Sequence, residues 1–326
     1  MKVAAPQTRP PVPTITKGGT FSLESPYQLL QKIPEIYREI EKTGFVVLRA
    51  WDNSEKTLLK VAQYFGRIQG HAKADERGLV TVTPERATNS PKEFDRNLSK
   101  TSQEFLLHTD GSFMNGICPV EEKYFRLGPP GLFLLQCVRP ASVGGESVLL
   151  DAEAVLNALV NEQPELARIA QMPGLLHFFG GDQVALDFPL FERLAVDRYR
   201  IRFRLDLALA KSENAASIRF LIDKFFLSPR FQTRRHLESN EIIVVDNSRI
   251  VHGRDGISLE GTEGARLLRR AWIWDEHNAE VEALSNSLSG LQAFERARVY
   301  GPKTDADLRL RPLSLGIRLS RQAESR

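Results

Sequence analysis

A histidine and an aspartate stand two positions apart, as His108-x-Asp110, at the end of an apolar run. If the run is a β-strand, residues two apart point to the same side, so the imidazole and the carboxylate project next to each other. Such a pair supplies two of the three ligands of a 2-His-1-carboxylate site for non-haem Fe(II). The pair therefore predicts a metal site, provided that the fold brings a second histidine to it.

Pairs of this kind also arise by chance, because the chain has 6 histidines and 41 acidic residues. A second pair, His236-x-Glu238, lies in a charged stretch before a predicted strand, and we interpret that stretch as solvated. His108 differs because an apolar segment leads into it and because Gly111 follows Asp110. The first pair is therefore the better candidate for a metal site.

His252 is the candidate for the third ligand, and it follows the β-branched run at residues 242–245. A histidine after a buried strand is more often a hydrogen-bonded structural residue than a ligand. Only the folded sheets could bring His252 to a pair that lies so far away in the sequence.

Two arginines at the start of the last apolar run add to the case for a site. Arg266 and Arg270 are four residues apart and share one face of a strand, whereas Arg269 points the other way. An arginine that faces inward needs an anionic partner, because burying an unpaired charge is costly. Its planar guanidinium fits a carboxylate in bidentate geometry. That carboxylate could belong to the protein, as a salt bridge, or to a ligand.

Periodicity of apolar residues predicts the elements that must position these groups. Helices are expected at residues 27–43, 55–65 after a cap at Asn53 or Ser54, 152–172 and 215–227. Pro34 implies a kink or two shorter helices in the first, and Pro164 implies a break in the third. Strands are expected at residues 45–49, 78–83, 131–138, 144–150, 199–205, 242–245 and 267–274. The strands form two clusters that do not alternate with the helices, which predicts an α+β fold around a mostly antiparallel sheet sandwich.

Two segments near these elements are polar. In the strand predicted at 199–205, Arg200, Arg202 and Arg204 alternate with apolar residues, a half-exposed pattern that turns the arginines toward solvent. The irregular segment 84–102 leads directly to the pair at His108, so it is either a lid over the site or an ordinary surface loop.

Composition excludes several classes of protein. Apolar residues make up 42% of the chain, and the net charge of +3 comes from interleaved charges without a basic block, so no nucleic-acid partner is expected. No stretch approaches the ~18 apolar residues of a membrane helix, and no secretory signal is visible. Cys118 and Cys137 form no closely spaced pair, which fits a reducing compartment. We expect a cytoplasmic protein with no membrane partner.

Four motifs together resemble the TauD/TfdA, or clavaminate-synthase-like, dioxygenases, and the likeness runs from about residue 43 to residue 274. The motifs occur in the order and approximate spacing of that family: His108-Thr109-Asp110, Gly144-Gly145-Glu146-Ser147, Asp246-Asn247 with His252-Gly253-Arg254, and Arg266-x-x-x-Arg270. The resemblance implies a distorted double-stranded β-helix, or jelly-roll, core flanked by helices. We expect one domain at residues 21–326, preceded by a flexible arm at residues 1–20.

The resemblance also implies the roles of the site residues. Fe(II) would be held by His108, Asp110 and His252, which leave room for 2-oxoglutarate and O2. The distal carboxylate of 2-oxoglutarate would pair with Arg266, helped by the hydroxyl of Ser147. Arg270 matches the position that in some relatives contacts an anionic substrate group or the co-substrate. Glu104 and Phe113 match positions that can face the substrate, although Glu104 could equally be an exposed strand residue. Arg204 is a spare cation that would suit a zwitterionic substrate. His71 matches a position that reaches the substrate in some relatives, although a surface histidine is the alternative.

The implied reaction is oxidation of an unactivated C–H bond of a small molecule, with release of succinate and CO2. Halogenating relatives replace the carboxylate ligand with a small residue, so Asp110 predicts hydroxylation rather than halogenation. The substrate would be a zwitterion such as an amino acid, or a natural-product intermediate. Desaturation and a non-catalytic jelly-roll binding protein are the alternatives, and self-association is left open.

Overall fold

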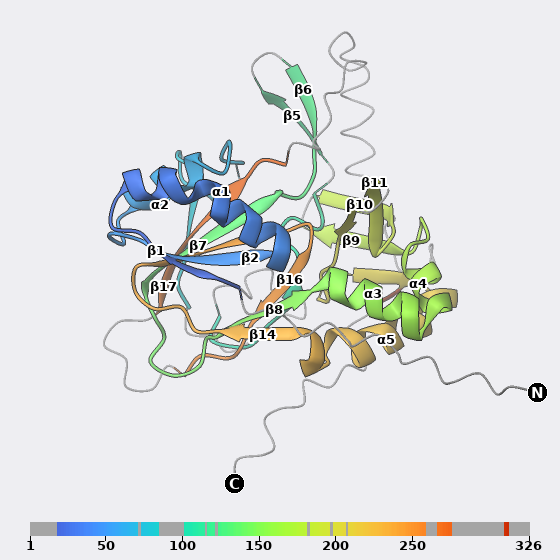
Figure 1. Ribbon diagram of the computed structural model, residues 1–326. Helices are drawn as coiled ribbons and strands as arrows, with labels where there is room; N and C mark the ends of the chain where they lie inside the picture. The colour runs from blue at the N-terminus through green and yellow to red at the C-terminus, as the bar shows by residue number, and fades with distance from the viewer. Residues whose placement is uncertain are drawn as a thin grey trace, which may run out of the picture.

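The computed structural model describes residues 18–70, 73–84, 101–114, 116–120, 123–180, 183–195, 198–206, 208–258, 266–275 and 310–312. Two facing β-sheets form its centre (Figure 1). The larger sheet is six-stranded, in the order β1 (Thr20–Ser22), β2 (Phe45–Arg49), β15 (Glu241–Asp246), β7 (Leu132–Arg139), β17 (Leu267–Ile273) and β3 (Leu79–Val82). The smaller sheet is four-stranded, in the order β14 (Gln232–Arg235), β8 (Ser147–Asp151), β16 (Ile250–Arg254) and β4 (Phe105–His108).

Both faces of the larger sheet are buried at β2 and β15, which is why these two strands read as nearly unbroken apolar runs. In β15, Ile243 and Val245 pack between the two sheets, whereas Ile242 and Val244 pack on the outer side. The outer side is covered by α1 (Pro26–Thr43) and α2 (Glu55–Gln63), as Figure 1 shows. Of these pairings only β1 with β2 is parallel, so the antiparallel sheet sandwich predicted from the sequence is confirmed.

A second core lies on the outer side of the smaller sheet. Val148 and Leu150 of β8 point into it, and Leu149 points between the sheets. This core is completed by α3 (Ala152–Glu162), α4 (Pro164–Ala170) and α5 (Ser212–Leu221). The remaining strands are β5 (Gly116–Val120), β6 (Lys123–Leu127), β9 (Leu176–Gly180), β10 (Gln183–Phe188), β11 (Phe191–Ala195), β12 (Arg198–Ile201), β13 (Ala208–Lys211) and β18 (Leu310–Pro312).

Several predicted boundaries need correction. Residues 26–43 form one continuous helix with Pro34 inside it, so of the two alternatives for this segment, a kinked helix or two shorter helices, the second is wrong. The helix predicted to reach residue 227 ends at Leu221 and continues as a π-helix, Ile222–Phe226. Thr20, placed by the sequence in the flexible arm, pairs with Val47 in the larger sheet. The predicted break at Pro164 is confirmed, because α4 begins there.

The predicted exposure of the arginines at 200 and 202 is wrong. Arg200 is 8% and Arg202 3% exposed. Arg200 is ion-paired with Asp275, and Arg202 donates to the carbonyl oxygens of Ser112 and Met114. An alternating pattern cannot distinguish a solvent-facing row from one that is buried against polar groups of distant segments.

Some expectations lie outside the described residues: His71, the arm up to residue 17, and all of the segment 85–100 that was predicted to be a lid or a surface loop. Within the described part of the chain, no helix is long and apolar enough to cross a membrane.

Gly44 ends α1 in the left-handed conformation, with a φ of 79°. A Cβ at this position would lie 2.5 Å from Cδ1 of Ile250, next to the strand that carries His252. Because a left-handed backbone is strained in residues with a Cβ, Gly44→Ala should lower the free energy of unfolding by about 2 kcal/mol in urea denaturation. Gly70→Ala is the control, since nothing lies within 4 Å of a Cβ there and the change should be under ~0.5 kcal/mol. Equal losses in both variants would contradict the prediction.

Candidate metal centre and co-substrate pocket

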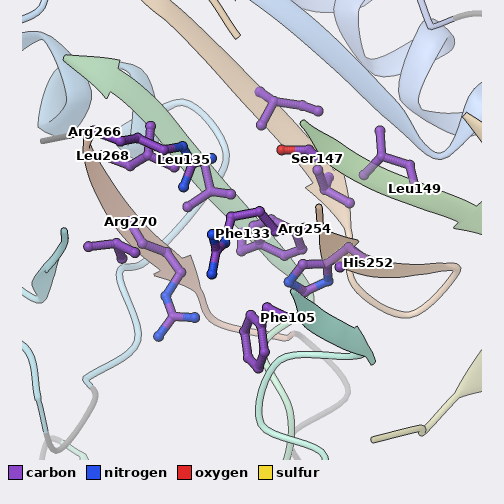
Figure 2. Close-up of a pocket in the computed structure, with 14 residues that line it drawn as sticks. Phe105, Phe133, Leu135, Ser147, Leu149, His252, Arg254, Arg266, Leu268 and Arg270 are labelled. Carbon is purple, nitrogen blue, oxygen red and sulfur yellow. The ribbon is translucent and has the colours of Figure 1, made fainter. Parts of the chain in front are cut away.

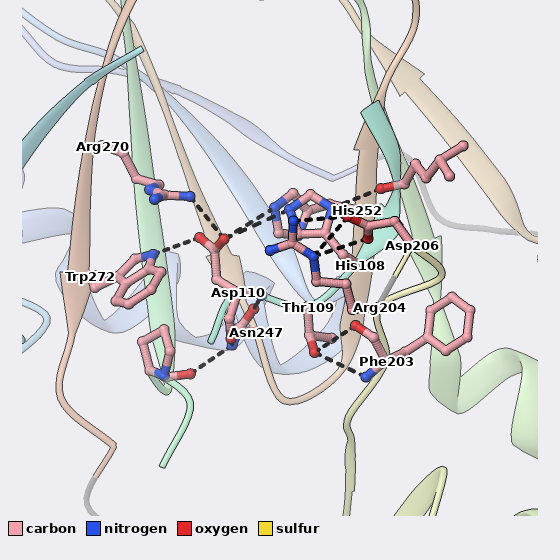
Figure 3. A network of polar contacts seen from close by, with 12 residues as sticks. His108, Thr109, Asp110, Phe203, Arg204, Asp206, Asn247, His252, Arg270 and Trp272 are labelled. Atoms are coloured by element: carbon pink, nitrogen blue, oxygen red, sulfur yellow. Dashed lines mark hydrogen bonds and ion pairs between the residues drawn. The ribbon is translucent and has the colours of Figure 1, made fainter. Parts of the chain in front are cut away.

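The three predicted metal ligands come together in the structure. His108 of β4 and His252 of β16 are directly opposite each other in the antiparallel ladder, with ring centroids 4.1 Å apart. Asp110 lies in the turn after β4, and its Oδ1 is 3.7 Å from Nε2 of His108 and 4.0 Å from Nε2 of His252. The potential ligand atoms all lie within 4.8 Å of one another. The predicted convergence of these side chains is therefore confirmed (Figure 3).

The turn that carries Asp110 is held from two sides. Thr109, which lies between two of the candidate ligands, exchanges hydrogen bonds with the backbone of Phe203. The side-chain amide of Asn247 accepts a hydrogen bond from the Asp110 N–H at 2.8 Å and donates to the carbonyl oxygens of Asp110 and Pro130. These bonds fix the backbone on both sides of the Asp110 carboxylate.

The protonation states suit a divalent metal. The Nδ1 of His108 lies 2.8 Å from the carbonyl oxygen of Leu106, so Nδ1 carries the hydrogen and Nε2 is free to bind a metal. Burial, together with the charge of Arg204, lowers the pKa of His108 to about 4. Burial and the neighbouring His108 lower the pKa of His252 well below its ordinary value. Both imidazoles are therefore neutral at neutral pH, as metal ligands must be.

Asp110 is ionised despite being buried. Burial alone would raise its pKa, but the Arg270 guanidinium and the Trp272 indole lower the pKa to about 2. Arg270 Nη1 donates to Oδ1 at 2.9 Å, and Trp272 Nε1 donates to Oδ2 at 2.6 Å. Figure 3 shows both side chains reaching the carboxylate from the side opposite to the two imidazoles.

A cavity of about 50 Å³ lies between the two sheets, next to His252 (Figure 2). Apolar side chains line most of it, and its polar groups are the Ser147 hydroxyl, His252 and three arginines, at positions 254, 266 and 270. The Arg254 guanidinium donates to the carbonyl oxygens of residues 101 and 103. A narrow cavity with this much positive charge suits a small anion.

Arg266 is the arginine in this cavity that has no acceptor among the described residues. It is 7% exposed, and burial lowers its pKa to about 10, so it remains a cation at neutral pH. Arg270, in contrast, is occupied by Asp110. The sequence left open which arginine pairs with the co-substrate; within the described part of the chain, Arg266 is the one of the two without an acceptor.

The predicted substrate-facing residues lie in different surroundings. Arg204 pairs with His108 in an isolated β-bridge, and its guanidinium forms a bidentate ion pair with Asp206. Phe113 is partly buried against the hydrophobic cores. Glu104 lies just before β4 and is exposed. Their contact with a substrate remains a prediction.

Sequence reasoning missed three groups that touch the site, namely Trp272, Asp206 and the amide of Asn247. Trp272 could have been found, because it lies two residues after Arg270 and so shares its face of the strand. Asn247 was part of a motif, but no pattern indicated that it binds the backbone of Asp110.

Comparisons with known proteins agree with this geometry. A family model described as taurine catabolism dioxygenase TauD, TfdA family, matches residues 7–272. Among solved structures, the chain is similar to asparagine oxygenase in complex with Fe(II), 2S,3S-3-hydroxyasparagine and succinate, at 15% identity and a TM-score of 0.57, covering 76% of this chain and 79% of that one.

Two further solved structures show the same likeness. The non-haem iron oxygenase OrfP, in complex with Fe and alpha-ketoglutaric acid, matches at 15% identity and a TM-score of 0.54, covering 76% of this chain and 80% of that one. AAD-2, in complex with Mn(II) and N-oxalylglycine, matches at 15% identity and a TM-score of 0.59, covering 82% of this chain and 99% of that one. At these identities the likeness shows a shared fold, and it confirms the predicted jelly-roll core.

Proposed function

The chain belongs to the taurine catabolism dioxygenase TauD, TfdA family, and from that membership we propose that it hydroxylates an unactivated C–H bond of a small molecule. The family makes the protein a non-haem iron, 2-oxoglutarate-dependent dioxygenase, which confirms the class predicted from the sequence. Succinate and CO2 are the products of the co-substrate.

The observation that carries the proposal is the convergence of one carboxylate and two neutral imidazoles beside a positively charged cavity. His108 and His252 would bind Fe(II) through Nε2, and Asp110 through Oδ1. Three protein ligands on one face leave the other positions of the metal open. When bound, Fe(II) supplies the oxidative decarboxylation of 2-oxoglutarate and the removal of a hydrogen atom from the substrate.

The cavity fits the distal carboxylate of 2-oxoglutarate. Arg266 is buried and has no acceptor among the residues that the structure describes, so a carboxylate beside it would remove the cost of an unpaired charge. The hydroxyl of Ser147 lines the same cavity and can donate to that carboxylate. Arg270 lies between this cavity and Asp110, where its charge can also act on the end of the co-substrate nearest to the metal.

The substrate is proposed to be a small zwitterion, such as an amino acid or a derivative of one. Arg204 and Asp206 offer a cation and an anion side by side, and the charge of Arg204 acts on His108. A substrate carboxylate could replace Asp206 as the partner of Arg204, and a substrate ammonium could replace Arg204 as the partner of Asp206. Asp110 fills the position that a halide would need, which favours hydroxylation.

An anaerobic titration tests the assignment. Adding Fe(II) and 2-oxoglutarate to the pure protein should produce the visible charge-transfer band of an iron-bound keto acid, and His108→Ala should abolish it. His236→Ala is the matched control, because His236 belongs to the other His-x-acid pair and should leave the band unchanged. Absence of the band in the unmodified protein would overturn the proposal.

A substrate screen tests the second part. Amino acids and their derivatives should stimulate succinate release from 2-oxoglutarate, and uncharged hydrophobic compounds of similar size should not. Stimulation by the hydrophobic set alone would contradict a zwitterionic substrate while leaving the reaction class intact.

A further inference from the structure

Strand β17 presents a second side chain, Trp272, to the metal centre beside Arg270. Residues 270 and 272 share a face, and Trp272 is 3% exposed, with its indole in the core between the two sheets. The indole Nε1 lies 2.6 Å from Oδ2 of Asp110. The guanidinium carbon of Arg270 lies 4.9 Å from the indole ring. One side chain thus contacts both the carboxylate ligand and its neighbouring cation.

The two oxygens of Asp110 have different surroundings. Oδ1 is the oxygen near both imidazoles, at 3.7 Å and 4.0 Å from their Nε2 atoms, so it faces the proposed metal position. Oδ2 is the oxygen bound by the indole. Carboxylates bind metals through one oxygen or through both, and the second mode occupies an additional coordination position. The indole N–H therefore competes with the metal for Oδ2.

Arg270 cannot serve the same purpose, because it binds Oδ1. A divalent cation at Oδ1 repels the guanidinium that donates to the same oxygen. The indole is neutral, and its N–H can only donate, so its bond to Oδ2 is compatible with a bound metal. Trp272 is therefore the group that can hold the carboxylate in one orientation both before and after metal binding.

We infer that Trp272 is a positioning residue that keeps Asp110 a one-oxygen ligand. The inference rests on the proposed function, because it assigns a second role around the same three ligands. Its consequence is that one more coordination position stays open for the co-substrate and O2. Partners that orient metal ligands in this way typically change metal affinity by about 10- to 100-fold when they are removed.

Cobalt(II) titration of the metal-free protein tests the inference without using catalysis. Trp272→Phe keeps an aromatic ring in the core and removes the N–H. We expect its dissociation constant for Co(II) to rise about 10-fold or more, because the carboxylate is no longer held in the orientation that points Oδ1 at the metal. The visible Co(II) absorption should also change, because Oδ2 becomes free to coordinate. Trp51→Phe is the matched control, since Trp51 packs against the outer core behind the larger sheet. That variant should keep the affinity and spectrum of the unmodified protein.

A second variant separates the hydrogen bond from packing. Site-specific replacement of Trp272 by benzothienylalanine keeps the shape of the ring and puts sulfur in place of the N–H, so it should reproduce the Phe variant. If both variants bind Co(II) with unchanged affinity and spectrum, Trp272 only fills space and the inference is wrong. If the unmodified protein does not bind Co(II) at all, the metal centre itself fails, and the proposed function is overturned together with the inference.

Discussion

Replacing Arg266 with glutamine is expected to raise the dissociation constant for 2-oxoglutarate about 100-fold or more, with iron affinity changed by less than about threefold. The guanidinium is the one buried cation of the cavity that has no acceptor within the described part of the chain. A carboxylate bound to it makes charge-assisted bonds in a site shielded from water, where each such bond contributes about 1.5–3 kcal/mol. Glutamine retains a donor but loses the charge and the bidentate geometry.

Two arginines of β17, the strand that begins directly after Arg266, make the test specific. Arg269→Gln is the matched control, because Arg269 faces the other side of β17 and binds the backbone of Asn53 and the side chain of Gln136. It should leave 2-oxoglutarate affinity unchanged. Arg270→Gln should change 2-oxoglutarate affinity less than Arg266→Gln does, because the Arg270 guanidinium is already paired with Asp110. The measurement is an anaerobic titration of each variant with 2-oxoglutarate in excess Fe(II), and a larger loss in Arg270→Gln would reverse the assignment.

Three strands that line the cavity, β7, β15 and β17, could be predicted from their apolar runs, whereas β16, which carries His252, was not predicted as a strand. In β15 every residue from Ile242 to Val245 is buried, so the run is apolar without interruption and can be recognised as a strand from the sequence. In β7 and β17 about half of the residues are buried, and polar residues such as Gln136 and Arg269 interrupt the apolar runs. The pair at His108 was recognisable for another reason, since its two residues are neighbours along the chain and need only a strand and a turn to meet.

Contacts between distant polar groups could not be predicted. Arg202 alternates with apolar neighbours and therefore looks like a surface residue, yet it is buried against the carbonyl oxygens of Ser112 and Met114. Its partners are backbone atoms, which are present at every position and leave no mark in the sequence. The role of Asn247 could not be predicted for the same reason, because its three hydrogen bonds are all to backbone atoms of other segments.

Short strands were missed where periodicity has too few residues to show. β9, β10, β11 and β13 have between four and six residues each, and β18 has three. These segments form strands because they hydrogen-bond to neighbouring strands, not because their local sequence pattern favours a strand.

Asn247→Ala should lower the free energy of unfolding by about 3 to 5 kcal/mol and disrupt the metal centre at the same time. Asn247 is 1% exposed. Its side-chain amide accepts a hydrogen bond from the Asp110 N–H and donates to the carbonyl oxygens of Asp110 and Pro130. Alanine leaves these three groups without their partner in a buried place, and each such group costs about 1–3 kcal/mol. Because the turn that holds Asp110 is then free to move, Co(II) should also bind more weakly.

Urea denaturation of the metal-free protein measures the first effect. Asn161→Ala is the matched control: the Asn161 amide donates to one backbone carbonyl at an exposed position of α3, and its loss should cost less than about 0.5 kcal/mol. Saturating Co(II) should restore part of the stability of Asn247→Ala, since a metal that binds only the folded state stabilises it by mass action. A loss below about 1 kcal/mol would mean that water or a backbone shift replaces the amide. The position of Asp110 would then be determined by Trp272, Arg270 and the metal rather than by the turn beneath it.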